Sequence, residues 1–244
     1  MSFVNTTALI TGASRGLGRA LALLLAGAGA RVVMVARNQA ALDAAVAEVT
    51  AAGGVAFGIA ADLGDKQQIH AIAGQATALV GPIDLLIHNA STLGPTPLPL
   101  LLDTECEDFE QVLQVNLLGP FRLTKILAGA MALRKSGTVV HISSDAAVSA
   151  YPNWGSYGVS KAALDHLSRS WAAELLDTGV RVLSVDPGEM DTVMHAAAIP
   201  EADPKTLTQP AVIAARILDM VARPAASGAR LSAPDWQVGK EGSS

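Results

Sequence analysis

Apolar residues in this chain form short, nearly continuous runs that alternate with longer stretches of helical periodicity. The runs are rich in β-branched residues, as is typical of strands that are covered on both faces of a parallel sheet. Seven runs predict strands: Thr6–Ile10, Arg31–Ala36, Val55–Ala60, Ile83–His88, Thr138–Ile142, Val180–Val185 and a short last one near Ala229–Ser232.

Helices are predicted between these runs. Gly53-Gly54 ends one of them, and Asp65 is a suitable N-cap for another that stops before Gly81-Pro82. The predicted helices are Gly18–Ala28, Gln39–Ala52, Asp65–Val80, Thr104–Arg134 as one helix or two, Ser156–Asp177 and Gln209–Ala222. Regular alternation of strand and helix implies right-handed crossovers. The predicted fold class is therefore α/β, a Rossmann-type doubly wound parallel β-sheet with helices on both faces.

Composition narrows the class of protein. Half of the 244 residues are hydrophobic and 16% are charged, which suits a heavily buried sheet in a single domain over residues 1–244. The net charge is −5 and the basic residues are scattered, so we expect no nucleic-acid partner. The longest early uncharged run, Ala20–Ala30, is too short to span a bilayer, and no basic segment precedes the first strand. We expect neither a membrane anchor nor a signal peptide.

Cysteine and histidine usage points away from disulfide and metal chemistry. Cys106 is the single cysteine and sits between two glutamates, so we expect it to be incidental. The histidines show no ligand spacing, and no metal is predicted. The expected compartment is the cytoplasm.

Polar and glycine-rich residues follow directly after the predicted strands. In parallel α/β sheets, ligands bind beyond the carboxyl ends of the strands, so this edge is the expected site. The strand ends carry Thr11-Gly12, Arg37-Asn38, Asp62, His88-Asn89, Ser143-Ser144 and Asp186-Pro187-Gly188.

The segment Thr11–Gly18 has the features of a phosphate-binding loop. It follows the first strand, opens a helix and carries glycines at G-x-x-x-G-x-G spacing rather than the commoner G-x-G-x-x-G. The glycines allow a tight turn and a close backbone approach, and the free N–H groups at the helix start favour an anion. The residues predicted to bind a dinucleotide here are Gly12, Ser14, Arg15, Gly16, Leu17 and Gly18.

The residue type at the end of the second strand indicates which group is accepted at the 2′ position of the adenosine ribose. An acidic residue there would bind a 2′-hydroxyl and repel a 2′-phosphate, but the strand continues into Arg37-Asn38. Arg37 and Arg15 carry the planar fork that suits a phosphate. The alternative is two solvated surface arginines. The sequence favours NADP(H) over NAD(H).

Tyr157 and Lys161 share one face of a predicted helix, since they lie four residues apart. A nearby ammonium favours the phenolate, so we expect Lys161 to lower the pKa of Tyr157 from its ordinary value of about 10. Such a tyrosine can exchange a proton with a carbonyl or an alcohol. Ser144 lies at a strand end, where its hydroxyl can bind the substrate oxygen. Asn116 is a mediocre helix former that needs partners when buried, and we expect it to hold a water behind Lys161.

Together, these features resemble the short-chain dehydrogenase/reductase family. The resemblance rests on the glycine pattern, Asn89-Ala90, Asn116, Ser144, Tyr157-x-x-x-Lys161 and Pro187-Gly188, in order and spacing over almost the whole chain. It implies that Tyr157 donates and accepts the proton, that Lys161 also binds the nicotinamide ribose and that Ser144 polarises the carbonyl. Asn116 would complete the tetrad through a water.

The resemblance also implies cofactor contacts and an assembly. The implied contacts are Asp62 and Leu63 at the adenine, Asn89 and Ala90 on the adenosine side, and Pro187, Gly188, Met190 and Thr192 at the nicotinamide carboxamide and phosphates. A homodimer or homotetramer would be built on the two long helices.

The chain departs from the family pattern at three places. Ser91 stands where glycine is usual, and His88 stands where asparagine is common. We expect both to adjust the turn without abolishing binding. The C-terminal segment reads Leu231–Trp236 instead of the frequent Val-Asp-Gly-Gly ending, so the usual last-strand interface does not transfer.

Substrate selection is expected in the segments Ser91–Leu102, Ala146–Trp154 and Glu189–Gln209, the last as a mobile lid. Trp154 would wall the pocket or pack in the core or at an interface. His195 could touch the substrate, but we expect it at a solvated lid position. Local similarity to sepiapterin and benzil reductases, which reduce bulky conjugated or vicinal dicarbonyls, rests on Thr92-Leu93-Gly94, Trp154-x-x-Tyr157 and the residues from Pro187 to Met194.

The predicted function is NADPH-dependent reduction of the ketone or aldehyde carbonyl of a small molecule, reversible as alcohol oxidation. One alternative is an NAD-dependent alcohol dehydrogenase, against which the missing acid after the second strand argues. Another is a non-catalytic NADP-sensing regulator, against which the intact set of Asn116, Ser144, Tyr157 and Lys161 argues.

Overall fold

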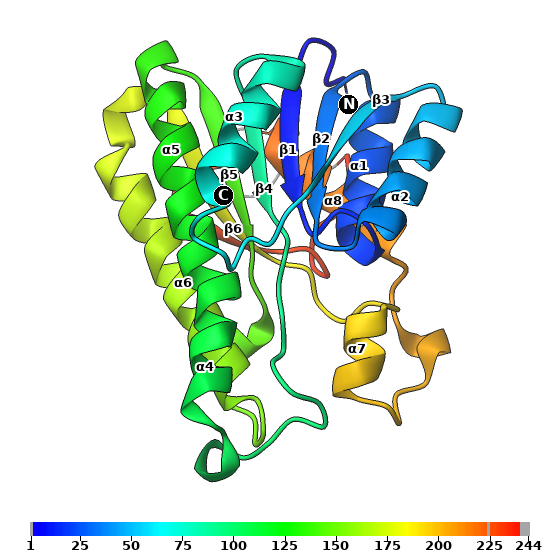
Figure 1. The fold of residues 1–244 in the computed structure, drawn as a ribbon, viewed down its shortest axis with the longest axis vertical. Helices are drawn as coiled ribbons and strands as arrows, with labels where there is room; N and C mark the ends of the chain where they lie inside the picture. Colours follow the sequence, from blue (N-terminus) through cyan, green and yellow to red (C-terminus); the bar gives the residue numbers. More distant parts are fainter. Residues whose placement is uncertain (1, 224, 240–244) are drawn as a thin grey trace.

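The structure is a computed structural model that describes residues 2–223 and 225–239. Its centre is a seven-stranded sheet in the order β3-β2-β1-β4-β5-β6-β7, and every pairing is parallel (Figure 1). The strands are β1 (Thr7–Thr11), β2 (Arg31–Ala36), β3 (Val55–Ala60), β4 (Leu85–His88), β5 (Gly137–Ile142), β6 (Val180–Asp186) and β7 (Arg230–Ser232). The order reverses between β1 and β4, where a doubly wound sheet forms its ligand crevice. The predicted fold class is confirmed.

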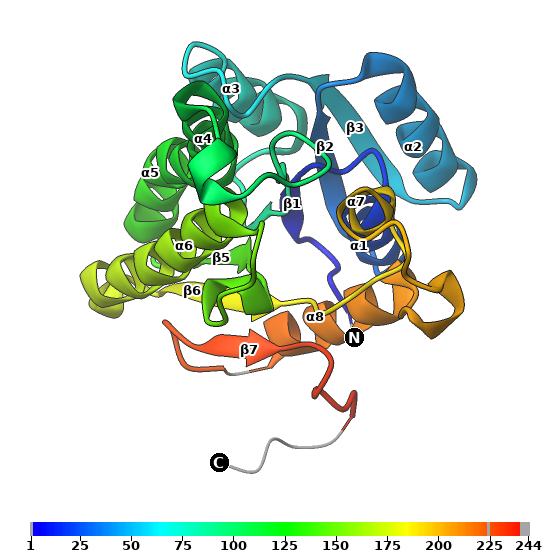
Figure 2. The ribbon, with the colours of Figure 1, turned by 90° about the horizontal axis from the view of Figure 1, so that it is seen from below.

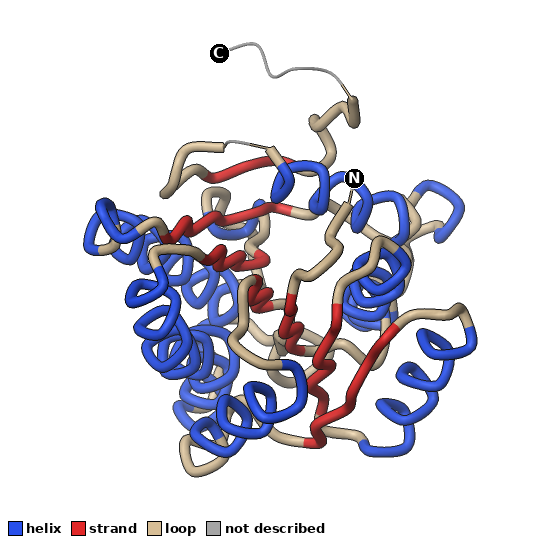
Figure 3. Tube along the Cα trace, turned by 90° about the horizontal axis from the view of Figure 1, so that it is seen from above, coloured by secondary structure: helices blue, strands red, loops and turns tan. Residues whose placement is uncertain are grey.

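Helices cover both faces of the sheet (Figures 2 and 3). One face packs against α1 (Gly16–Gly27), α2 (Gln39–Ala51) and α8 (Pro210–Ala222). The other packs against α3 (Ile69–Val80), α5 (Gly119–Arg134) and α6 (Gly155–Glu174). Within β1, Ala8 and Ile10 belong to the first core and Leu9 to the second, because successive strand residues point to opposite faces. Burial on both faces explains the continuous apolar runs in the sequence.

The predicted start of α3 is wrong. The helix begins at Ile69, and Asp65 instead holds a turn that precedes it. The Asp65 carboxylate accepts hydrogen bonds from the backbone N–H of Gln67 at 2.9 Å and from the side chain of Gln68 at 2.9 Å. Short polar side chains often stabilise such turns instead of a helix start.

The segment 104–134 forms two helices joined by a π-helical turn. α4 (Cys106–Leu113) runs into the π turn Gln114–Leu118, which leads into α5. The sequence left open one helix or two and gave no sign of the wider turn. A π turn inserts an extra residue and redirects the side chains around it, and such turns recur at functional sites. Here it contains the buried Asn116.

The segment after β6 lies beyond the carboxyl ends of the strands, with the short helix α7 (Val193–Ala198) at its centre (Figure 1). A bridge between Met190 and Thr208 closes the base of this segment. The N-terminal end of α4 and the loop before it lie at the same end of the molecule in Figure 1. Within the described residues, no helix is long and apolar enough to cross a membrane.

Candidate active site

A cavity of about 1210 Å³ lies at the carboxyl ends of the strands and collects most of the predicted site residues. Asn116 and Gly18 are not among its lining residues. The predicted residues that line it are Gly12, Ser14, Arg15, Gly16, Leu17, Arg37, Asp62, Leu63, Asn89, Ala90, Ser144, Tyr157, Lys161, Pro187, Gly188, Met190 and Thr192.

The glycine loop is a tight turn that a side chain would break. Gly12 has a φ of +66°, and a Cβ there would lie 2.8 Å from the Cα of Ala90. A Cβ at Gly18 would strike the carbonyl of Gly12. The Asn89 side chain donates to the carbonyls of Thr11 at 3.1 Å and Gly12 at 3.0 Å, and so ties the loop to the end of β4.

This loop fits the pyrophosphate of a dinucleotide. It leads into the N-terminus of α1, whose first turn carries no acidic residue. Unpaired N–H groups at a helix start favour an anion. A Cβ at Gly16 would lie 3.4 Å from the Thr192 methyl, so Thr192 faces the loop across the cavity. The bare backbone on one side and Thr192 on the other form a cradle of the kind such a group requires.

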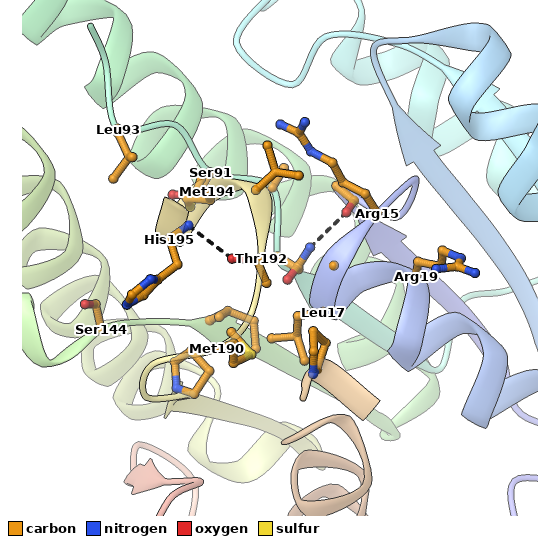
Figure 4. A pocket seen from close by; sticks show the side chains of 18 of the residues that line it. Arg15, Leu17, Arg19, Ser91, Leu93, Ser144, Met190, Thr192, Met194 and His195 are labelled. Atoms are coloured by element: carbon orange, nitrogen blue, oxygen red, sulfur yellow. Dashed lines mark hydrogen bonds between the residues drawn. The ribbon is translucent and has the colours of Figure 1, made fainter. Parts of the chain in front are cut away.

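Two arginines lie in the part of the cavity where the sequence predicts the adenosine. Arg15 and Arg37 both line it and are exposed, and neither has an ion-pair partner among residues 2–223 and 225–239. Arg19 lies nearby but is paired with Glu48. Figure 4 shows Arg15 and Arg19 on one side of the cavity and Ser144 on the other.

Tyr157 is buried at the other side of the cavity, with 8% of the residue exposed. Burial raises its pKa to about 12, and the charges of Asp145 and Asp186 act in the same direction. Hydrogen bonds with Ser144 and Ser91 lower the pKa but do not cancel the effect of burial. The expected fall in the pKa of Tyr157 is therefore wrong for this structure, because desolvation outweighs the opposing groups.

Lys161 lies under the tyrosine, with its Nζ 5.5 Å from the centre of the Tyr157 ring. The ammonium is buried and donates to the carbonyl of Ile142 at 2.8 Å. Burial lowers the pKa of Lys161 to about 8, against the opposing charge of Asp165. Burial thus has opposite effects on the two groups: it makes Tyr157 keep its proton and makes Lys161 lose its proton more easily.

Asn116 is 1% exposed and is held by a set of hydrogen bonds. Its side-chain oxygen accepts from the Thr92 N–H at 2.8 Å and from the Ser91 hydroxyl at 3.1 Å. Its amide nitrogen donates to the Thr92 carbonyl at 2.9 Å and to the Ser160 hydroxyl at 3.0 Å. Asn116 therefore connects the π turn, the segment after β4 and α6. That it also holds a water behind Lys161 stays a prediction.

Arg230 contacts the backbone of Ser144, and nothing in the sequence predicts this role for it. Its guanidinium donates to the Ser144 carbonyl at 2.8 Å, to Asp186 at 3.1 Å and to Asp165 at 2.9 Å. Asp165 also accepts a hydrogen bond from Ser184. The last strand therefore fixes the backbone of Ser144 and the start of the segment after β6. The atypical C-terminal segment was the only sign in the sequence that this region differs.

Apolar side chains wall the cavity around Tyr157. The group comprises Leu93, Ala146, Trp154, Tyr157, Met194 and Ala198, and Leu98 packs against it without lining the cavity. Trp154 lines the cavity, which is the first of the two predicted alternatives, and its ring also packs edge-on against the Tyr157 ring with centroids 5.7 Å apart. The expected solvated position of His195 is wrong, because its side chain is only 11% exposed and lines the cavity.

His88, which stands where the family commonly has asparagine, is buried outside the cavity. His88 is 2% exposed, bonds to Thr124 at 2.8 Å and stacks on His141 with centroids 5.0 Å apart. Neither histidine lines the cavity. The Asn89 turn that follows keeps its hydrogen bonds to the glycine loop. Within the described residues, no three metal-ligating side chains gather where they could hold an ion.

Comparison with known proteins identifies the family. Residues 6–203 match the model of the short chain dehydrogenase family, so the chain belongs to this family and is an oxidoreductase by class. A 3-oxoacyl-[acyl-carrier-protein] reductase of Synechocystis sp. is 37% identical over 188 residues, which cover 77% of this chain and 75% of that protein. A longer short chain dehydrogenase of Pseudocercospora fijiensis is 38% identical over 195 residues, which cover 78% of this chain and 61% of that protein.

Solved structures with a similar fold bind either form of the cofactor. A short chain dehydrogenase from Shigella flexneri, complexed with NADP, has a TM-score of 0.88 at 27% identity and covers 95% of this chain and 98% of its own. An NAD+-bound xylitol dehydrogenase has a TM-score of 0.85 at 25% identity, with coverage of 95% and 98%. Family membership therefore indicates a nicotinamide dinucleotide without deciding between the two.

Proposed function

We propose that this protein reduces the ketone or aldehyde carbonyl of a small molecule with NADPH, reversibly, and that Tyr157 is the general acid. The observation that carries this proposal is the position of Tyr157. The residue is buried in the wall of a cavity that Ser144 also lines, in a chain whose glycine loop fits a dinucleotide at the other side.

The residues that would hold the cofactor are those of the glycine loop, the ends of β2, β3 and β4, and the segment after β6. They are Gly12, Ser14, Arg15, Gly16, Leu17, Gly18, Arg37, Asp62, Leu63, Asn89, Ala90, Tyr157, Lys161, Pro187, Gly188, Met190 and Thr192. The nicotinamide, when bound, supplies or accepts the hydride.

The protein's own part is to place the carbonyl and to manage one proton. A tyrosine with a pKa of about 12 holds its proton at neutral pH and is available as an acid. Ser144 would donate to the same substrate oxygen as negative charge builds there. After the transfer, the ammonium of Lys161 stabilises the phenolate on Tyr157. Asn116 positions Ser91 and α6 around these groups.

The preference for NADPH is supported by Arg15 and Arg37. Both line the cavity, and β2 ends without a carboxylate that would repel a 2′-phosphate. The NAD-dependent alcohol dehydrogenase remains the second candidate, since the NAD+-bound neighbour shares the fold. A homodimer or homotetramer on the long helices, and a place in the cytoplasm, complete the proposal.

The test measures the oxidation of NADPH and of NADH with a panel of ketones, aldehydes and vicinal diketones. The loss of near-ultraviolet absorbance reports the rate. The likeness to sepiapterin and benzil reductases stays a prediction and supplies the bulky dicarbonyl members of the panel. NADPH-selective turnover supports the proposal. Selective turnover with NADH supports the NAD-dependent alcohol dehydrogenase. Tight NADPH binding without turnover of any member favours the non-catalytic NADP-sensing regulator.

A further inference from the structure

His195 places an uncommitted imidazole in the apolar wall of the cavity. Both ring nitrogens, Nδ1 and Nε2, are buried and have no hydrogen-bond partner among the described residues. The helix that carries it is capped by Thr192, whose hydroxyl accepts from the His195 backbone N–H at 3.2 Å, so the residue is fixed in place. Figure 4 shows the imidazole of His195 directed away from Thr192 and lying among the side chains that line the cavity.

Such a side chain is costly unless something binds to it. A buried polar group without a partner loses its hydration and gains no bond in return. Buried polar side chains in folded proteins are therefore nearly always hydrogen-bonded. The neighbours on the same short helix, Met194 and Ala198, are apolar and pack with the group around Tyr157. They supply no partner.

Asp145 and Ser91, which also line the cavity, already have hydrogen-bond partners, whereas the Ser143 hydroxyl has none among the described residues. The Asp145 carboxylate accepts from the hydroxyls of Ser144 at 2.9 Å and Tyr151 at 2.9 Å and from the Ala146 N–H at 2.8 Å. Ser91 is bound to Asn116. His195 differs from Asp145 and Ser91 because both of its ring nitrogens lack a partner, and it lines the cavity on the helix whose Met194 and Ala198 pack with Tyr157.

We propose that His195 binds a second oxygen of the substrate, separate from the carbonyl that Tyr157 protonates. A neutral imidazole offers one donor and one acceptor, so a ketone, hydroxyl or ether oxygen would satisfy it. The Glu189 carboxylate lies 3.7 Å from Nε2, and Asp145 lines the same cavity. These two negative charges disfavour an anionic group at this position. The substrate class is thus a neutral, largely apolar carbonyl compound with a second oxygen.

This inference rests on the proposed function, and its test separates the two. Matched pairs of ketones share one carbon skeleton, such as 1-phenylpropane-1,2-dione, which has a second carbonyl at C2, and propiophenone, which has a methylene group there. Wild-type turnover of any member tests the proposed function first. We then expect His195→Leu to lower kcat/KM about tenfold more for the two-oxygen member than for its partner, mainly through a higher KM. His195→Gln should recover part of this selectivity.

Met194→Leu is the matched control, because it changes an adjacent apolar residue of the same helix. It should alter both members of each pair by the same factor. If His195→Leu changes kcat/KM by the same factor for both members of a pair, the role of His195 is overturned while the proposed function stands. Wild-type protein that turns over no carbonyl compound overturns the proposed function, and this inference with it.

Discussion

The hydroxyl of Ser91 donates a hydrogen bond to the side-chain oxygen of Asn116 at 3.1 Å, and the interaction of Ser91 with Tyr157 lowers the pKa of that tyrosine. A serine in place of the usual glycine thus connects the buried asparagine directly to the tyrosine. The hydroxyl has one proton, which it can turn from Asn116 to Tyr157 when the tyrosine oxygen becomes charged. This connection lowers the pKa of Tyr157 against the effect of burial.

Ser91→Ala should therefore weaken the acid. We expect kcat for carbonyl reduction to fall about fivefold, since a hydrogen bond is worth about 1 kcal/mol net. The alkaline limb of the pH profile of kcat should move to higher pH, because a bond that favours the phenolate is lost. Ser91→Thr keeps the hydroxyl and is the control. A pH profile of Ser91→Ala that overlays the wild type contradicts the assigned contact.

Tyr157→Phe should lower kcat by about 10²–10⁴-fold, the usual contribution of a positioned general acid. The ring and its packing remain, so calorimetry should give a Kd for NADPH within about threefold of wild type. The chain has one other tyrosine, Tyr151, whose hydroxyl bonds to Asp145 at the rim, and Tyr151→Phe is the matched control. A rate close to wild type in Tyr157→Phe would remove the tyrosine from the mechanism.

Much of the fold and of the candidate site follows from the sequence, because both depend on local signals. Strands buried on both faces produce continuous apolar runs, and the residues that end them necessarily meet at one edge of the sheet. The positions of Gly12, Asn89, Ser144 and Tyr157 around one cavity are predictable on this basis.

The features that the sequence did not predict depend on contacts between distant segments. The burial of His195 depends on how the segment after β6 folds back over the cavity. The π turn at Asn116 has no periodicity of its own. Arg230 acquires its role from Asp165, 65 residues away in sequence. The pKa of Tyr157 was also mispredicted, because helical spacing reports that Lys161 is near but says nothing of desolvation.

Arg37→Asp should weaken NADPH binding far more than NADH binding. The substitution removes a cation that faces the adenosine side of the cavity and places there the acidic residue that suits a 2′-hydroxyl. We expect the Kd for NADPH to rise at least about 30-fold and that for NADH to change less than about threefold, measured by calorimetry. Lys66→Asp, at an exposed position in the turn before α3 and outside the cavity, controls for net charge. Equal effects on both cofactors would exclude Arg37 as the reader of the 2′-phosphate.

Arg230→Met should destabilise the protein, because it leaves the carboxylates of Asp165 and Asp186 without their cation. Their side chains are 4% and 12% exposed, and an unpaired buried charge costs about 3–5 kcal/mol, less here because Arg230 itself is 26% exposed. We expect a loss of about 2–3 kcal/mol in the free energy of unfolding by urea. Adding Asp165→Asn should recover part of that loss, since one uncompensated charge is removed. Additive losses in the double variant would show that the two residues do not interact.

The burial of Lys161 makes a testable contribution to stability against pH. Its pKa is about 8 in the folded protein against an ordinary value of 10.5, so between these values the unfolded chain binds a proton that the folded protein has released. The free energy of unfolding must then rise with pH across this window, while below about pH 8 both states are protonated and the contribution is constant. We expect a relative rise of up to about 3 kcal/mol, since one pKa unit corresponds to about 1.4 kcal/mol.

The measurement is urea unfolding of wild type and Lys161→Met, without added nucleotide, in steps from about pH 8 to about pH 10. Only wild type should gain stability from this group, so the difference between the two proteins should change with pH. The series ends near pH 10 because the raised pKa of Tyr157, about 12, acts in the opposite direction above its ordinary value of 10. Lys125→Met removes an exposed lysine on α5 and should run parallel to wild type. Parallel curves for Lys161→Met as well would mean that the ammonium of Lys161 is hydrated in solution and that its pKa is not lowered.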